Sequence, residues 1–326
     1  MRILHFYSSK VFAGLERHVE ELSFQQSHNN EVAVVGPSNL KDKFRSNYIA
    51  LNTNQWRHSP FIKWDVKKIL ESFNPDIVHT HAFKMTSFVA GANKNFKHVS
   101  TIHGSKKNIH PFLQSDFIFG VSEKSLGNLS LRNSQVLENW VDENRFKNFK
   151  KSEGEYALYL GRFEAVKNLQ RLIKSWQNIK EKLLLVGDGK QKKEIISFVR
   201  FNGLENIVSI DESSDNVSKI LEKAKVLIIS SDREGSPKVV YEALYCGVPV
   251  LSTDCGNLKD LLPSSCVSKI DDSDFKKLLS KWSKDFSLLK NEQRDVFTKI
   301  KNENTLKVKA QEVLEIYKSL LSKASK

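Results

Sequence analysis

The sequence has few cysteines and no long apolar segment. Its 326 residues include three cysteines, Cys246, Cys255 and Cys266, an odd number without the spacing of a metal site. This usage fits a reducing cytoplasm better than a disulfide-stabilised secreted protein. The longest apolar runs, such as 239–244 and 248–251, are far too short to cross a bilayer, and residues 1–7 predict a buried strand rather than a secretory signal. We therefore expect a cytoplasmic protein.

Motifs of two other protein classes are also missing. No Gly-x-Gly-x-x-Gly follows the first apolar run, which argues against a NAD-linked dehydrogenase. No arginine-rich tract, zinc-finger spacing or RNA-binding aromatic pattern occurs, so we expect no nucleic-acid partner.

Positive charge is what the chain has in excess. The formal net charge is +13, of which residues 1–150 carry +7 (20 Lys and Arg against 13 Asp and Glu) and the remainder +6. A basic protein favours phosphorylated substrates or anionic membrane surfaces, although a lysine-rich solvated surface would explain the charge equally simply. The composition, 40% hydrophobic and 27% charged, is that of a globular protein.

Short apolar runs alternate with amphipathic segments, which predicts an α/β fold with parallel sheets. The alternation starts twice, so we expect two Rossmann-like, doubly wound domains facing a central cleft. The expected strands are 2–7, 31–35, 76–79, 98–102 and 117–121, then 156–160, 182–186, 207–210, 226–230 and 249–253. We place the domains at 1–148 and 149–305, with a polar linker at 142–154 and a final helix at 306–326 that packs back towards the first domain.

The most informative stretch lies between residues 231 and 256. It contains two carboxylates eight residues apart, Glu234 on a loop after an apolar strand and Glu242 in the helix that follows. Both can face the crevice at the carboxyl ends of the strands, where α/β sheets bind ligands.

The start of that helix is the second part of the same pattern. Ser236 is expected to cap it and Pro237 to be its first residue. The first amides, near Lys238 and Val239, would then point at an anion such as a diphosphate. Carboxylates for hydroxyl groups beside amides for phosphates predict a nucleotide-sugar site.

Segments along nearly the whole chain resemble one known family. The Glu234-x7-Glu242 element and the Ala-Leu-Tyr-Cys-Gly-Val-Pro-Val that follows it resemble the signature of retaining glycosyltransferases of family 4, which have the GT-B fold. Further segments resemble that family in order and spacing, namely 13–17, 75–81, 100–104, 139–142, 160–168 and 186–189.

The resemblance implies roles for single residues. Arg162 and Lys167 would neutralise the charge that grows on a departing nucleoside diphosphate, and Glu234 would contact the donor sugar, so these three are the expected catalytic residues. The expected donor-binding residues are Gly14, His103, Gly187, Ser236, Pro237, Lys238, Val239 and, on the ribose, Glu242. Simpler structural explanations stay open. Gly14 and Gly187 could each serve only a turn, and Arg162 and Lys167 could be ordinary exposed charges.

The resemblance also implies a reaction. A hexose would move from a nucleoside diphosphate sugar, with UDP favoured, to a glycan or lipid-linked acceptor, with retention at the anomeric carbon and without an obligatory metal or a cofactor. The acidic pair Asp271 and Asp272 lies in a late helical region rather than at a strand end, which agrees with this expectation. The expected context is bacterial lipopolysaccharide or surface-polysaccharide synthesis.

The acceptor is expected on the first domain. The segment 56–68 mixes two tryptophans and a phenylalanine with basic residues, which suits an anionic lipid headgroup or a lipid-linked glycan at the inner face of the cytoplasmic membrane, or an ordinary helix packed on the sheet. Three alternatives remain for the function: a nucleotide-sugar epimerase, an inverting transferase on the same scaffold, and a non-catalytic basic binding module.

Overall fold

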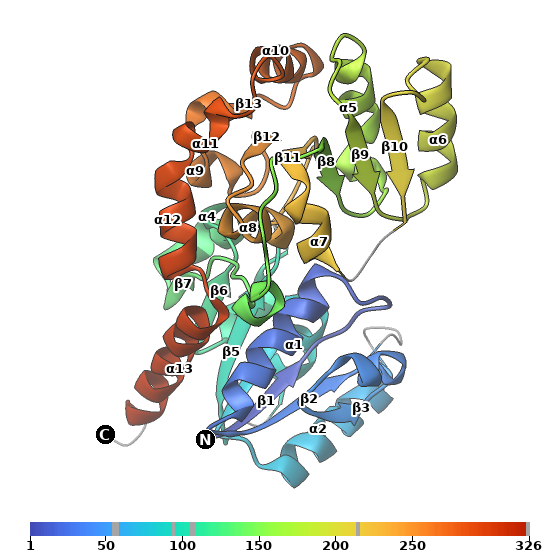
Figure 1. The fold of residues 1–326 in the computed structure, drawn as a ribbon. Coiled ribbons are helices and arrows are strands. Elements are labelled where there is room, and N and C mark those ends of the chain that lie inside the picture. The colour runs from blue at the N-terminus through green and yellow to red at the C-terminus, as the bar shows by residue number, and fades with distance from the viewer. Residues whose placement is uncertain (54–58, 93–94, 105–107, 213–215, 324–326) are drawn as a thin grey trace. The chain divides into compact units, whose positions relative to one another are not determined.

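The protein consists of two compact units, each built around one parallel sheet (Figure 1). The structure, a computed structural model, describes residues 1–53, 59–92, 95–104, 108–212 and 216–323. Unit 1 comprises Met1–Asn139 and Leu306–Lys326, and unit 2 comprises Trp140–Thr305. The expected pair of doubly wound α/β domains is confirmed.

Unit 1 contains a seven-stranded sheet in the order β3-β2-β1-β4-β5-β6-β7, with all neighbours parallel. Its strands are β1 Arg2–Phe6, β2 Glu31–Gly36, β3 Asn47–Ala50, β4 Ile77–His81, β5 Lys97–Ile102, β6 Phe117–Gly120 and β7 Ser134–Val136. Its α-helices are α1 Gly14–Ser27, α2 Pro60–Phe73, α3 Ala82–Ala90, α4 Glu123–Leu126 and α13 Leu306–Ser322. Its 3₁₀ turns are η1 Ser38–Lys43, η2 His110–Gln114 and η3 Gly127–Leu131.

Unit 2 contains a six-stranded parallel sheet in the order β10-β9-β8-β11-β12-β13. Its strands are β8 Tyr156–Leu160, β9 Leu183–Val186, β10 Val208–Asp211, β11 Ala224–Ile229, β12 Val250–Thr253 and β13 Val267–Ser268. Its α-helices are α5 Leu169–Trp176, α6 Lys192–Phe201, α7 Val217–Glu222, α8 Lys238–Tyr245, α9 Leu258–Leu261, α10 Asp272–Trp282, α11 Leu288–Glu292 and α12 Arg294–Glu303. Its 3₁₀ turns are η4 Glu143–Phe146, η5 Ala165–Lys167 and η6 Ser264–Cys266.

Both sheets reverse their strand order at one point. The chain starts in the middle of each sheet, builds outward to one edge, and then returns to add strands on the other side. The reversal lies between β1 and β4 in unit 1 and between β8 and β11 in unit 2. In open α/β sheets, loops at the carboxyl ends of the two strands that flank such a point diverge and leave room for a ligand.

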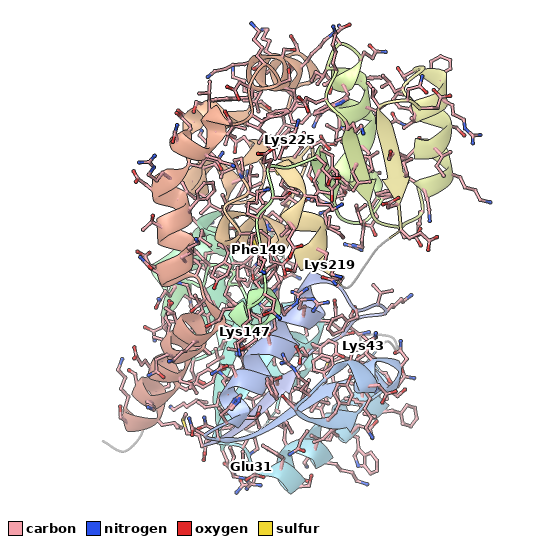
Figure 2. The ribbon with its side chains drawn as sticks, viewed as in Figure 1. Glu31, Lys43, Lys147, Phe149, Lys219 and Lys225 are labelled. Carbon is pink, nitrogen blue, oxygen red and sulfur yellow. The ribbon has the colours of Figure 1, made fainter. Side chains whose placement is uncertain are left out.

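The boundary between the units differs from the expected one. Unit 2 begins at Trp140, not at residue 149. The polar segment 142–154 looks like a linker in the sequence, but Phe146 is buried in the core of unit 2 and Phe149 packs against that core. Figure 2 labels Phe149 and its neighbour Lys147 on this segment. Two apolar anchors among charged residues therefore tie the segment to unit 2.

The final helix α13 belongs to unit 1, where it packs against α1. The hydroxyl of its buried Tyr317 lies 2.5 Å from Nδ1 of His79 in β4. Helix α4 is only four residues long. α4 ends after Leu126 because Gly127 adopts a φ of +51°, and η3 follows it.

Candidate functional site

The loops that follow β8 and β11 lie at the switch point of unit 2 and are bonded to one another. The amide of Asp232 donates to the carbonyl of Val166 at 2.9 Å, and the Ser230 hydroxyl donates to the carbonyl of Lys167, also at 2.9 Å. These bonds fix the distance between the two loops. The side chains that the loops carry are thereby held in position before any ligand arrives.

Lys167 and Glu234 are brought together across these loops. Nζ of Lys167 lies 2.5 Å from Oε1 of Glu234, and the two side chains are 17% and 11% exposed. Ser231 donates from Oγ to the same carboxylate oxygen at 2.6 Å. The carbonyl of Ser231 accepts a hydrogen bond from the Thr253 hydroxyl. Thr253 is close enough because its strand, β12, pairs with β11. The sequence predicted both charged residues but neither their direct contact nor the role of Ser231.

Arg162 also lies at the carboxyl end of β8, but it is more exposed than Lys167 and Glu234. It follows Gly161 directly after β8, its side chain is 54% exposed, and its guanidinium contacts Glu164 at 2.6 Å. A pair this exposed adds little to stability. The guanidinium can therefore turn towards an arriving anion at small cost.

Glu242 lies on α8 with only 6% of its surface exposed. Nη1 of Arg145 donates to Oε1 of Glu242 at 2.6 Å. Arg145 comes from η4, in the segment that the sequence analysis assigned to a surface linker, and it is the main residue that reasoning from the sequence missed. A positive residue beside a buried carboxylate can be recognised only once the fold brings residues 97 positions apart into contact.

The start of α8 differs in detail from the expectation. Pro237 is the residue before the helix rather than its first residue, and the helix begins at Lys238. Ser236 does not cap it; its hydroxyl lies 3.3 Å from the Tyr241 hydroxyl instead. The Lys238 ammonium donates to the Trp140 carbonyl at 3.2 Å and lies over the indole ring. The amides of Lys238 and Val239 remain the first two of the helix.

Gly187 lies where the loops after β8 and β9 touch. A Cβ at this position would come within 1.9 Å of the Gly161 carbonyl oxygen, so no larger residue fits. Gly256 has the same function for the loop after β12, because a Cβ there would meet the Gly235 carbonyl at 2.5 Å. Both glycines allow backbone segments to approach closely around Glu234 and Arg162. Close approach of the two loops explains why residue 187 is a glycine, and its role in donor binding stays a prediction.

Gly14 and His103 lie in unit 1. Gly14 is the first residue of α1, and within the described residues no atom lies within 4 Å of where its Cβ would be. His103 follows β5, and its Nε2 lies 3.3 Å from Nδ1 of His81. Neither residue belongs to the group of charged side chains in unit 2.

Buried histidines line the strand ends of unit 1. His5, His79 and His81 are each at most 1% exposed. Burial lowers the pKa of His5 to about 4, and burial together with neighbouring imidazoles holds the pKa values of His79 and His81 well below the usual range. These rings are therefore neutral at physiological pH.

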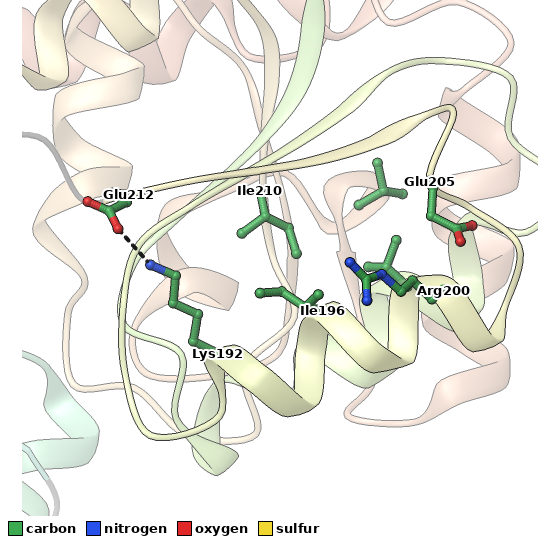
Figure 3. A pocket seen from close by; sticks show the side chains of 8 residues that line it. Lys192, Ile196, Arg200, Glu205, Ile210 and Glu212 are labelled. Carbon is green, nitrogen blue, oxygen red and sulfur yellow. Dashed lines mark hydrogen bonds and ion pairs between the residues drawn. The ribbon is translucent and has the colours of Figure 1, made fainter.

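A pocket and an acidic pair of unit 2 lie apart from the charged residues at its switch point. A pocket of about 410 Å³ lies beside α6 and β10, and Figure 3 shows its Lys192–Glu212 contact at 3.1 Å. It is not lined by Arg162, Lys167, Glu234 or Glu242.

Asp272 and Asp274 have Asp-x-Asp spacing in the first turn of α10, a spacing that the sequence analysis overlooked. Asp272 binds Arg171 at 2.7 Å, and Asp274 lies 3.6 Å from Lys277. Both carboxylates are therefore paired with cations of unit 2.

Comparison with known proteins gives consistent results. Two family models match: glycosyltransferase family 4 over residues 12–137, and glycosyl transferases group 1 over residues 141–299. An uncharacterized glycosyltransferase from Methanocaldococcus jannaschii is 31% identical over 60% of this chain, and the match spans 61% of that protein's own length. The capsular polysaccharide biosynthesis glycosyltransferase CapH of Staphylococcus aureus is 23% identical over 77% of this chain and 79% of its own.

Solved structures share the fold. The crystal structure of Anabaena HepE in complex with UDP has a TM-score of 0.84 and 15% identity, covering 98% of this chain and 100% of that one. The two doubly wound units therefore have the GT-B fold of glycosyltransferases. Within that class the chain belongs to glycosyltransferase family 4. Among the described residues, no helix is long and apolar enough to cross a membrane.

Proposed function

We propose that this protein transfers a hexose from a nucleoside diphosphate sugar to a glycan or lipid-linked acceptor of a bacterial surface polysaccharide, with retention at the anomeric carbon. The observation that carries the proposal is the Lys167–Glu234 pair at the switch point of unit 2. It is largely buried, held by Ser231, and adjacent to the loop that carries Arg162. A pair that served stability alone would need no position at a ligand-binding crevice.

The pair can divide its two charges between the two ends of a donor. Lys167, with Arg162, would bind the diphosphate, whose negative charge grows as the bond to the sugar breaks. Glu234 would accept hydrogen bonds from sugar hydroxyls, since an ionised carboxylate has room for about four donors and Ser231 and Lys167 take two at one oxygen. Fixed cations of this kind supply the charge stabilisation that a metal ion supplies in other transferases, so the proposed reaction needs no metal.

Glu242 would bind the ribose. Arg145 occupies one of its carboxylate oxygens and fixes the direction of the other. The two first amides of α8, those of Lys238 and Val239, would receive the phosphates at the positive end of the helix. UDP is the favoured nucleotide, and the UDP in the structure of the similar Anabaena protein supports that preference.

The acceptor side would be on unit 1, and α2 is the feature that supports a membrane-bound acceptor. Trp56 and Arg57 lie outside the described residues, but Phe61 and Trp64 on α2 are 73% and 57% exposed. The Lys68 ammonium lies 3.5 Å from the centroid of the Trp64 ring. Exposed aromatic rings beside lysines are suited to the interface of an anionic bilayer, where lipid-linked acceptors reside.

A panel of donors tests the proposal. The full-length chain is heated with UDP-, GDP-, ADP- and CMP-sugars, and the one that raises the melting temperature is then offered with polyprenyl-linked and free glycan acceptors. We expect UDP-sugars to stabilise the protein, because a ligand that binds only the folded state raises its stability. The anomeric configuration of the product, read by NMR, separates a retaining from an inverting transferase. A nucleotide that binds without turnover on any acceptor would favour the binding module, and sugar inversion without transfer would favour an epimerase.

A further inference from the structure

Five histidines of unit 1 lie within contact distance of one another. They come from elements far apart in sequence: His5 from β1, His18 from α1, His79 and His81 from β4, and His103 from the loop after β5. Neighbouring ring centroids are 4.3 to 5.7 Å apart. Unit 2 contains no histidine at all, since the last of the nine is His110. Of these five residues, only His103 is among the donor-binding residues that the sequence leads us to expect.

Three of these rings converge on one point. One nitrogen from each of His18, His81 and His103 lies within 4.8 Å of the other two. Nδ1 of His81 and Nε2 of His103 are 3.3 Å apart, and the His18 and His103 rings stand nearly perpendicular, at 87°. Two nitrogens bound to a tetrahedral zinc ion at about 2.0–2.1 Å are themselves about 3.3 Å apart. The separation of this one pair already equals that of two nitrogens on a zinc ion, and the nitrogen of His18 lies within 4.8 Å of both.

The outer nitrogens of these rings are held as those of metal-binding histidines are. Nδ1 of His18 lies 3.2 Å from Oδ1 of Asn139, an oxygen that can only accept, so the proton is on Nδ1. His5 likewise donates from Nε2 to Oε1 of Gln26 at 2.8 Å, which leaves its Nδ1 to accept from Nε2 of His81 at 3.1 Å. His18 thus directs Nε2, and His81 directs Nδ1, as lone-pair nitrogens. Such outer bonds fix the tautomer and orientation of metal ligands.

A second histidine triad in the unit lacks these properties. His5, His79 and His81 also bring nitrogens within 4.8 Å of one another. However, both nitrogens of His79 are bonded to hydroxyl groups outside the cluster, that of Tyr317 at 2.5 Å and that of Thr101 at 2.6 Å, whereas both bonding partners of His81 are histidines. All three rings are also inaccessible, whereas His103 is only half-buried and gives the first triad an approach from outside.

We propose that His18, His81 and His103 form a site for one divalent transition-metal ion of the zinc class in unit 1. Three imidazoles with a fourth position open are a common ligand set for zinc, cobalt and nickel ions. The ion would take no part in the transfer reaction proposed above, which uses the cations of unit 2, but it would bind His103, one of the expected donor-binding residues. Occupancy would engage His103, so excess metal should inhibit any activity that uses its ring.

The test measures metal binding and does not depend on activity. The full-length chain, without a polyhistidine tag and freed of metal by a chelator, is titrated with Co²⁺ and with Zn²⁺. We expect one Co²⁺ per chain with the visible absorption bands of a tetrahedral ion, displacement of those bands by Zn²⁺, and a rise in melting temperature with Zn²⁺. Since the readout is binding, its failure is distinguishable from failure of sugar transfer.

Variants locate the site. His103→Ala should weaken Co²⁺ binding by more than about tenfold with no change in the far-UV circular dichroism, because His103 is half-buried at a loop. His103→Cys should restore binding and add a thiolate-to-cobalt charge-transfer band. The control is His28→Ala, which removes an exposed histidine at the end of α1 and should leave binding unchanged. Absence of cobalt bands in the unmodified chain, or equal binding by the His103→Ala variant, would show that the cluster is only a hydrogen-bonded network.

Discussion

The two units share one strand order but use opposite chemistry at their strand ends. In unit 1 the residues near the β1–β4 switch point are buried imidazoles, which are neutral because burial lowers their pKa values. In unit 2 the corresponding loops carry Arg162, Lys167 and Glu234 as ion pairs. The fold alone therefore does not decide the chemistry, and the side chains at the switch point do.

This difference matches the two halves of the proposed reaction. A nucleoside diphosphate sugar carries its negative charge on the diphosphate, and fixed cations lower the free energy of a transition state in which that charge grows. An acceptor hydroxyl is uncharged and needs only hydrogen-bonding partners. Unit 2 is thus suited to the donor, and unit 1 to a neutral partner. The predictions below test this division, starting with the largest expected effect.

Replacing Lys167 should have the largest effect. In Lys167→Ala, Glu234 keeps Ser231 but loses its cation, and the diphosphate loses a fixed positive charge. We expect turnover to fall by about 100-fold or more, the usual loss when one preorganised charge is removed. Initial rates of sugar transfer measure it. Lys193→Ala, an exposed lysine on α6, is the matched control and should keep its rate. Near-normal turnover in Lys167→Ala would remove unit 2 from the chemistry.

Glu242→Ala should have the next largest effect, on donor binding. The change removes the proposed ribose acceptor and leaves the Arg145 guanidinium without its carboxylate. We expect donor affinity and turnover each to fall by more than tenfold, since a hydrogen bond to a charged group is worth roughly 1.5–3 kcal/mol. Calorimetric titration with UDP measures the affinity. The doubly changed Arg145→Met, Glu242→Ala chain removes the unpaired guanidinium as well, so recovery of stability without recovery of affinity would place the loss at the ribose.

Features that show in a short stretch of sequence were predicted, whereas features that depend on contacts between distant residues were not. The central strands were predicted because buried parallel strands are continuous apolar runs. β3, β7 and β13 were missed; they are edge strands of 4, 3 and 2 residues, too short and too polar to stand out. The edge strand β10, with its apolar residues, was predicted at 207–210, so it is shortness and polarity rather than the edge position that hid the other three.

The same limit applies to the site. Glu234 and Glu242 were singled out by their spacing, and Arg162 and Lys167 by the resemblance to the glycosyltransferase family. Arg145 was missed, because it is 97 residues from its partner and lies in a segment whose charges suggest a linker. Only the buried Phe146 beside it, a large apolar residue in a polar stretch, could have suggested that the segment is packed.

Membrane binding should separate the units by a smaller factor. Phe61 and Trp64 are exposed on α2 of unit 1, and Phe201 is 86% exposed on α6 of unit 2. The Phe61→Ser, Trp64→Ser double variant should bind vesicles containing anionic lipid about fivefold more weakly, because partial burial of the two rings in the interface together contributes of order 1 kcal/mol. Co-sedimentation measures it. Phe201→Ser removes a comparably exposed ring from unit 2 and should change nothing; equal loss in both would contradict a membrane-facing unit 1.

The smallest expected effect is a loss in the free energy of unfolding at alkaline pH, which arises from a buried thiol of unit 2. All three cysteines lie in unit 2, and burial raises the pKa of Cys255 from 9.0 to about 11. A raised folded-state pKa adds stability that is complete below pH 9 and is lost as the pH rises towards 11, because the unfolded chain then releases the proton more readily. Between pH 8 and pH 10 we expect Cys255 to account for a loss of about 1 kcal/mol in the free energy of unfolding. Urea titrations at the two pH values measure it. In Cys255→Ala that part of the pH dependence should disappear, although the variant is less stable at both pH values. Ionisation of buried tyrosines in both units also lowers the free energy of unfolding at alkaline pH. The contribution of the Cys255 thiol is therefore the difference between the pH dependence of the unmodified protein and that of Cys255→Ala.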